Sequence, residues 1–195
     1  DIIEPNQRYS ASLFKKDALE AISNIANRGK LPIMVGGTGL YVDAVLFDYS
    51  FSSGEQQKDS NNPRHLSKST QKNRGELRPN TLVIGLNRSR DELNIRIEER
   101  AKQMLEAGFI NEVNTLVDKY GTDNEALSGI GYRTFAKYLR GDITLELAKA
   151  EFVKGDKSLA KRQRTWFKRN KSIHWINPSQ ANKIVHDFVT KNRGG

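Results

Sequence analysis

The stretch Val35-Gly36-Gly37-Thr38-Gly39-Leu40-Tyr41 decides the fold expected for this chain. The apolar run Leu31–Val35 that leads into it does not alternate with polar residues, which is typical of a strand covered on both faces in a parallel sheet. The glycines then turn the chain into a helix over residues 38–47, and the N–H groups of such a turn can face a phosphate. A purely structural turn explains the same residues, so the stretch alone predicts a strand–turn–helix unit without naming a ligand.

The rest of the chain alternates between expected helices and strands. Ser10 can cap a helix that ends near Gly29. Ser89 and Glu92 form a capping-box pattern for a second helix, which ends near Gly108. We predict further strands at 81–86 and 172–176, further helices at 111–119, 132–139 and 144–169, and a closing helix that includes residues 181–189. Strands separated by helices favour an α/β layer architecture with a helical appendage.

Composition limits the class of partner. The chain has 195 residues and a formal net charge of +9, which favours a polyanionic partner because basic surface attracts phosphate backbones. A basic protein with a merely solvated surface is the alternative. The chain has no cysteine, which fits a reducing compartment. No apolar run approaches the roughly 18 residues of a membrane span, so we expect no membrane association.

Residues 51–80 differ in character from the rest. Ser, Asn, Gln, Lys and Arg dominate there, which is typical of a mobile linker or a shortened insertion. We therefore divide the chain into residues 1–50, which form part of an α/β core, residues 51–80, and residues 81–195, which hold the remainder of the core with the long helices.

The expected helix at 144–169 carries two opposite stripes. One is apolar and recurs every seven residues, at Leu145, Phe152, Leu159 and Trp166. The other is basic and recurs at three and four residues, at Lys154, Lys157, Lys161, Arg164 and Lys168. Because like charges repel, the basic stripe favours a partner that neutralises it, with a solvated face as the alternative. Trp166 belongs to the packing stripe, so we interpret it as a core residue in preference to a platform for a base.

Arg100 has no ion-pair partner on its own helix. Its neighbours three and four residues away include no carboxylate; they are Arg96, Ile97, Gln103 and Met104. A guanidinium that borders an apolar face needs an anion, which either another segment or a ligand supplies.

Five motifs occur in one order along the chain. They are Tyr9-Ser10-Ala11 before a helix, Gly-Gly-Thr-x-Leu-Tyr at 36–41, Arg-Ile-x-x-Arg at 96–100, Gly-Tyr-Arg at 131–133, and a stretch at 160–169 that matches Ala-Lys-Arg-Gln-x-Thr-Trp-Phe-Arg. Together they resemble the tRNA dimethylallyltransferases, also called tRNA isopentenyltransferases, over nearly the whole chain outside residues 51–80. The resemblance implies a P-loop NTPase-like parallel-sheet core, incomplete in this chain, with long C-terminal helices.

The family's reaction is the transfer of a dimethylallyl group from its diphosphate to N6 of the adenosine immediately 3′ of a tRNA anticodon. By resemblance, the base is flipped into a channel and its amine attacks the allylic carbon. Mg²⁺ and cationic groups then stabilise the departing pyrophosphate. The resemblance thus implies tRNA and dimethylallyl diphosphate as partners and Mg²⁺ as cofactor, and we expect a cytoplasmic monomer.

The resemblance also implies roles for single residues. Arg100 would be the catalytic residue that contacts the pyrophosphate, and Gly36, Gly37 and Thr38 would line the substrate channel. The implied tRNA contacts are Arg64, His65, Leu66, Ser67, Lys68, Ser128, Gly129, Ile130, Gly131, Tyr132, Arg133, Lys161, Arg162, Gln163, Arg164, Thr165, Trp166, Phe167 and Lys168.

Two departures from the family pattern stand out. The Gly-x-Thr-x-Ser-Gly-Lys-Thr phosphate loop and the segment with the catalytic aspartate are not among these residues, and a larger helical insertion is reduced to residues 51–80. The first residue is Asp1 and not methionine, so we expect the later part of such a transferase, inactive alone, with its Mg²⁺ site elsewhere. The three histidines show no metal-ligand spacing, and we predict no metal site here. The alternatives are a non-catalytic RNA-binding module and part of a small-molecule kinase, which does not need the long basic helix.

Overall fold

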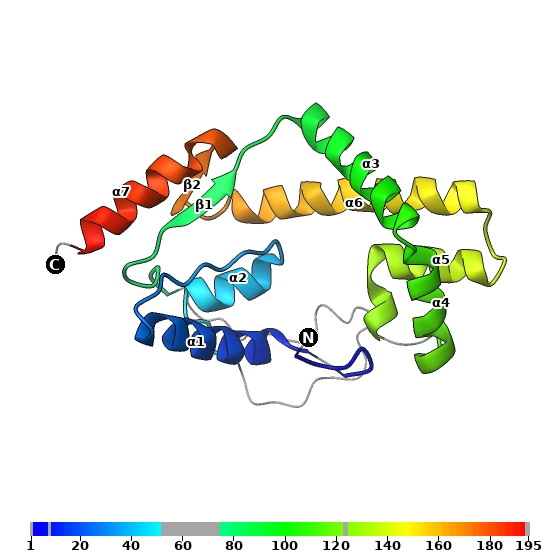
Figure 1. Ribbon diagram of the computed structural model, residues 1–195, viewed down its shortest axis with the longest axis horizontal. Helices are drawn as coiled ribbons and strands as arrows, with labels where there is room; N and C mark the ends of the chain where they lie inside the picture. Colours follow the sequence, from blue (N-terminus) through cyan, green and yellow to red (C-terminus); the bar gives the residue numbers. More distant parts are fainter. Residues whose placement is uncertain (1, 8, 52–74, 123–124, 194–195) are drawn as a thin grey trace. The chain divides into compact units, whose positions relative to one another are not determined.

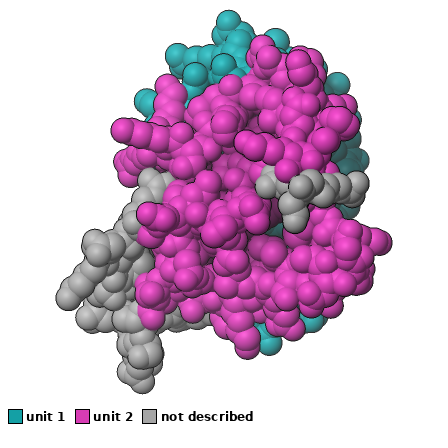
Figure 2. Space-filling model, turned by 90° about the vertical axis from the view of Figure 1, so that its left-hand side faces the viewer, with its two compact units in different colours: residues 1–8, 86–165 teal, residues 9–85, 166–195 magenta. Residues whose placement is uncertain are grey.

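The computed structural model describes residues 2–7, 9–51, 75–122 and 125–193 (Figure 1). In these ranges the elements follow in the order α1 (Ala11–Asn27), α2 (Gly39–Leu46), β1 (Val83–Leu86), α3 (Arg90–Glu106), α4 (Phe109–Tyr120), η2 (Glu125–Ser128), α5 (Ile130–Leu139), α6 (Leu145–Phe167), β2 (Ile173–Ile176), η3 (Pro178–Gln180) and α7 (Ala181–Arg193). The chain divides into two compact units (Figure 2). Unit 1 comprises residues 1–8 and 86–165, and unit 2 comprises residues 9–85 and 166–195.

The helix boundaries follow the signals in the sequence. Ser10 and Ser89 cap α1 and α3, since each hydroxyl accepts a hydrogen bond from the N–H three residues ahead, at 3.2 and 3.1 Å. The Glu92 carboxylate pairs with Arg88 instead of closing the capping box. Gly108 follows α3 with φ at 93°, in the left-handed region that favours glycine. The caps predicted at both serines are therefore confirmed.

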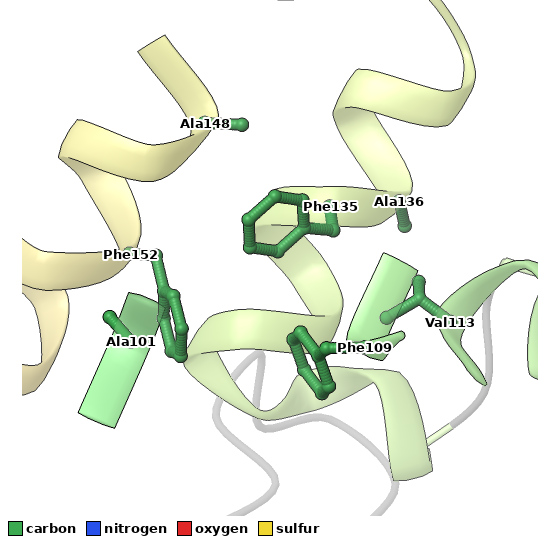
Figure 3. Packing of buried hydrophobic residues seen from close by; sticks show 7 residues of the cluster. All are labelled: Ala101, Phe109, Val113, Phe135, Ala136, Ala148 and Phe152. Carbon is green, nitrogen blue, oxygen red and sulfur yellow. The ribbon is translucent and has the colours of Figure 1, made fainter. Parts of the chain in front are cut away.

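Three phenylalanines form the centre of unit 1. Phe109 of α4, Phe135 of α5 and Phe152 of α6 have ring centroids 5.7 to 5.8 Å apart. Phe135 meets the other two rings edge to face, whereas Phe109 and Phe152 are stacked with 17° between their planes. Figure 3 shows these rings among the aliphatic members of the cluster, Ala101, Val113, Ala136 and Ala148. The apolar stripe predicted for α6 thus packs at Phe152, which is buried.

Two glycines let α5 approach α6 closely. A Cβ atom at Gly155 of α6 would lie 2.3 Å from Cγ2 of Ile130, and one at Gly131 would lie 2.9 Å from the ring of Phe109. Larger residues would push these side chains away. The first turn of α5 is therefore fixed against the middle of α6, although a glycine inside a helix costs about 1 kcal/mol relative to alanine.

Unit 2 combines a small sheet with a helix pair. The strands β1 and β2 form a parallel two-stranded sheet, and a Cβ atom at Gly85 of β1 would lie 2.7 Å from the Trp175 side chain of β2. The helices α1 and α2 pack together, with the ring of Phe14 stacked on that of Tyr41 at 4.9 Å between centroids. The buried core of this unit includes Ala44, Leu46, Phe47 and Tyr49.

The expected strand at Leu31–Val35 is absent, so that prediction is wrong. The segment has no regular secondary structure, and the side chains of Ile33 and Val35 are 74% and 91% exposed. A strand needs a neighbour for its backbone N–H and C=O groups, and the only ladder among the described residues joins β1 to β2. The described part of the chain is therefore mostly helical with one small sheet, and the expected α/β layering is confirmed only in part. No helix in that part is long and apolar enough to cross a membrane.

Candidate nucleic-acid and diphosphate contacts

A cationic face runs along α6 and just beyond its end, and we define it as Lys154, Lys161, Arg164 and Lys168. These four side chains are exposed, and none forms an ion pair with another described residue. The fifth residue of the predicted stripe is different, because the Lys157 ammonium binds the Glu98 carboxylate of α3 at 2.6 Å. One position of the stripe is thus neutralised within unit 1, and the four residues of the cationic face are not.

The other predicted contacts near the end of α6 use their side chains in several ways. Arg162 is exposed and flanks the cationic face, whereas Gln163 and Phe167 are half-buried. The Thr165 hydroxyl donates a hydrogen bond to the Lys161 carbonyl at 3.0 Å. Of these, only Arg162 adds charge to the exposed surface.

Trp166 packs against α2 in unit 2. Its indole N–H donates a hydrogen bond to Oδ2 of Asp43 at 2.9 Å, and Asp43 is 5% exposed. The five-membered part of the indole lies against Gly39, where a Cβ atom would be 2.3 to 2.5 Å from three ring atoms. The Arg169 guanidinium lies over the indole, 6.0 Å from its centroid. These are packing contacts, but 36% of the Trp166 surface is exposed, so the interpretation of Trp166 as a core residue is only partly correct.

The glycine turn that precedes α2 is open to solvent. Gly36 and Thr38 are exposed and Gly37 is half-buried. The Thr38 carbonyl begins α2 by accepting a hydrogen bond from the N–H of Val42 at 3.1 Å, whereas the Thr38 hydroxyl makes no capping hydrogen bond. That hydroxyl can therefore meet a ligand. Sequence reasoning missed the role of Gly39, and the signal for it is a poor helix former in the first turn of a helix.

Arg100 finds its anion on another segment of unit 1. Its Nη1 atom lies 3.8 Å from Oδ2 of Asp156 in α6, beyond the length of a hydrogen bond. The Arg100 side chain is 65% exposed, whereas that of Asp156 is only 12% exposed. An exposed pair of this length contributes little, about 0 to 1 kcal/mol. The guanidinium is therefore oriented but remains open to an anionic ligand. Sequence reasoning missed Asp156, which lies beside the apolar stripe at Phe152 and Leu159.

The segment Ser128–Arg133 joins structural and exposed residues. Ile130 and Gly131 pack inside unit 1, whereas Arg133 is exposed. The Tyr132 hydroxyl donates a hydrogen bond to Oε1 of Glu112 at 2.6 Å. Burial, together with this hydrogen bond to the carboxylate, raises the pKa of Tyr132 to about 12. The contact with Glu112 fixes the first turn of α5 and leaves Arg133 directed to solvent.

The predicted contacts fall in different parts of the chain. Unit 1 holds Arg100, the segment 128–133 and residues 161–165, and unit 2 holds the glycine turn and residues 166–168. The remaining predicted contacts lie outside the described residues, and they are Arg64, His65, Leu66, Ser67 and Lys68.

Comparisons of sequence point to one family. The family model described as IPP transferase matches residues 1–69 and 55–170. The tRNA dimethylallyltransferase of Staphylococcus epidermidis is 30% identical over 241 residues, which cover 97% of this chain and 73% of that protein. That of Alkaliphilus metalliredigens is 32% identical over 244 residues, which cover 100% of this chain and 78% of that protein.

Solved structures agree with the sequence comparisons. The tRNA delta(2)-isopentenylpyrophosphate transferase of Staphylococcus epidermidis matches with a TM-score of 0.79 at 28% identity, over 100% of this chain and 80% of that one. The full-length tRNA isopentenylpyrophosphate transferase of Bacillus halodurans also matches with a TM-score of 0.79, at 29% identity, over 98% of this chain and 76% of that one. The chain is similar to both in fold as well as in sequence.

Proposed function

This chain belongs to the IPP transferase family, and from that membership we propose that it serves the transfer of a dimethylallyl group from dimethylallyl diphosphate to tRNA. The acceptor is N6 of the adenosine on the 3′ side of the anticodon. Relatives at 30% and 32% identity bear the name tRNA dimethylallyltransferase, which supports the proposal.

The observation that carries the proposal is the cationic face of α6. Its four side chains have the same sign, and none forms an ion pair with another described residue. Like charges at this spacing destabilise a helix by a few tenths of a kcal/mol per pair. A phosphate backbone removes that repulsion and gains from the release of its own counterions. A tRNA therefore fits this face better than a neutral partner does.

The chemistry assigns a role to Arg100. The lone pair of the adenosine N6 attacks the allylic carbon, the bond from that carbon to the diphosphate oxygen breaks, and its electron pair leaves with the pyrophosphate. The proton leaves N6 for a base. Arg100 stabilises the charge that develops on the leaving group, because its guanidinium is exposed and only loosely held by Asp156. The Thr38 hydroxyl lies in the turn proposed to border the channel for the adenosine.

Mg²⁺ is the cofactor that the family resemblance implies. No three acidic or histidine side chains gather among the described residues in a way that could hold a metal ion. Mg²⁺ therefore stays an expectation from the family resemblance.

The test is the binding of an anticodon stem-loop RNA to the 195-residue chain, measured by fluorescence anisotropy over a range of salt concentrations. The triple variant Lys161→Ala, Arg164→Ala and Lys168→Ala is expected to weaken binding. Its plot of log K against log salt should lose a slope of about 2, since each lost contact to single-stranded RNA accounts for about 0.7.

A matched control removes three exposed lysines elsewhere, Lys16, Lys30 and Lys183. It lowers the net charge by the same amount, and we expect it to keep the wild-type slope. Equal losses in the two triple variants would contradict the proposal, because net charge alone would then account for binding. Dimethylallyl diphosphate should raise RNA affinity if the site serves transfer, and it should have no effect on a non-catalytic RNA-binding module.

A further inference from the structure

A buried carboxylate fixes the orientation of Trp166. Asp43 of α2 is 5% exposed, and it accepts the indole hydrogen bond from a residue 123 positions away. A carboxylate at this depth has lost most of its water, and a hydrogen bond from the indole replaces part of that solvation. The indole has a single N–H donor, so this one bond determines the direction in which the ring points.

A second contact holds the same ring. Gly39 lies one helical turn before Asp43 and therefore on the same face of α2. A Cβ atom at Gly39 would be almost equally distant from three atoms of the ring, at 2.3, 2.4 and 2.5 Å, which places the ring face-on to the glycine. Any side chain at this position would displace the indole. Asp43 thus holds the indole at its N–H, and Gly39 contacts the face of the same ring.

Two exposed cations follow Trp166 and depend on its position. The Arg169 N–H donates a hydrogen bond to the Trp166 carbonyl at 3.2 Å, so the backbone turns tightly after the tryptophan. The Arg169 guanidinium also lies over the indole, 6.0 Å from its centroid. Lys168 lies between these two residues and is exposed. A displaced indole would therefore move both cations.

We propose that Asp43 is a positioning residue, which holds Trp166 and thereby sets Lys168 and Arg169 in place for contact with the phosphates of tRNA. The inference rests on the proposed function, since it concerns how two cations meet the RNA. Asp43 does not bind the RNA, because a carboxylate repels phosphate. Removal of its charge alone would tighten RNA binding, whereas loss of its positioning role weakens binding. These opposite signs make the two roles separable.

The experiment compares Asp43→Ala, Asp43→Asn and Trp166→Phe by two readouts. The first is the ¹H–¹⁵N spectrum of the indole N–H groups of the two tryptophans, in which Trp166→Phe identifies the resonance of Trp166. We expect slow exchange with solvent in the wild type and in Asp43→Asn, which keeps an acceptor oxygen, and fast exchange in Asp43→Ala. The second readout is the affinity for the stem-loop RNA. Asp43→Ala and Trp166→Phe should each weaken it at least about fivefold, with a salt slope lower by about 0.7 to about 1.4, as expected for the loss of one or both of the contacts made by Lys168 and Arg169.

Three comparisons make the result decisive. The double variant Asp43→Ala, Trp166→Phe should bind no more weakly than either single variant, because both changes break the same indole hydrogen bond. Asp187→Ala removes an exposed acid of the same unit and should not weaken binding. If Asp43→Ala fails to fold, Trp166→Phe decides, since it keeps a packed ring and loses the N–H.

The outcomes separate the two proposals. An Asp43→Ala chain that binds RNA as tightly as the wild type, or more tightly, would overturn the inference and leave the proposed function standing. Failure of Asp43→Asn to restore binding when the indole N–H is still protected would also overturn it. A wild-type chain that binds no RNA would overturn the proposed function and the inference with it.

Discussion

Replacement of Glu98 by glutamine is expected to tighten RNA binding while it slightly destabilises the chain. Lys157 lies in register with the cationic face of α6, but its ammonium binds the Glu98 carboxylate at 2.6 Å. The pair has no net charge and does not attract RNA. Glutamine keeps the size of the side chain and removes its charge, so Lys157 becomes a fifth cation beside the four of the cationic face.

The size of the effect follows from counterion release and from exposure. One further contact to single-stranded RNA adds about 0.7 to the salt slope, which corresponds to about fivefold tighter binding at about 0.1 M salt. The side chains of Lys157 and Glu98 are 35% and 56% exposed, so solvent screens their attraction. Loss of the ion pair should therefore lower the free energy of unfolding by at most about 1 kcal/mol. Binding and stability move in opposite directions.

The assay is RNA affinity by fluorescence anisotropy between about 50 and about 200 mM salt, where such contacts have a large effect, together with unfolding in urea. Glu106→Gln is the matched control, because Glu106 lies on the same helix and pairs with another lysine of that helix, Lys102, at 3.7 Å. Equal tightening by both variants would show a general effect of charge. Unchanged affinity of Glu98→Gln would refute the reasoning that Lys157 is directed at RNA.

Three further predictions concern Arg100, the core and the pH dependence. Arg100→Gln should weaken the binding of inorganic pyrophosphate in calorimetry and change the free energy of unfolding by less than about 1 kcal/mol, since its ion pair is long and exposed; equal weakening by the control Arg96→Gln would contradict a specific role. Phe135→Ala should lower the free energy of unfolding by about 3 to 5 kcal/mol in urea, because it empties the place between Phe109 and Phe152; a loss below about 1 kcal/mol would mean that the ring is not buried as described. The pKa of Tyr132 rises from 10.0 to about 12 on folding, so folding favours the protonated phenol. The contribution of the Tyr132 phenol to stability is complete below pH 10 and is lost as the pH rises toward 12. When the free energy of unfolding is measured against pH, Tyr132→Phe should therefore lose less of it over this range than the wild type does.

Local signals in the sequence predicted the helices well. Ser10 and Ser89 each cap a helix through a hydrogen bond from the backbone N–H three residues ahead, so both partners are close in sequence. The apolar period of α6 can likewise be recognised within that one helix. The strand expected at Leu31–Val35 failed because a strand depends on a neighbour that lies elsewhere in the chain. An apolar run indicates that burial is favourable, but it does not indicate which segment covers the run.

The candidate site was predictable in its residue types and not in its pairings. Lys157 and Lys161 are equivalent in the sequence pattern, and only the structure shows that Glu98, 59 positions away, neutralises the first. The sequence does not decide whether a protein acid or a ligand is the anionic partner of Arg100. In the structure Asp156 forms a long ion pair with it. Such contacts form between helices, so the periodicity of one helix cannot reveal them.

The close approach of Ile130 to Gly155 has a consequence for how this sequence can diverge. The space that a side chain at position 155 would need is already filled by a methyl group of Ile130, so the two positions share one volume. In related sequences, a residue larger than glycine at position 155 should appear together with a residue smaller than isoleucine at position 130. The two positions should therefore change together during evolution. A substitution at only one of them should persist only in chains that are stable enough to tolerate it.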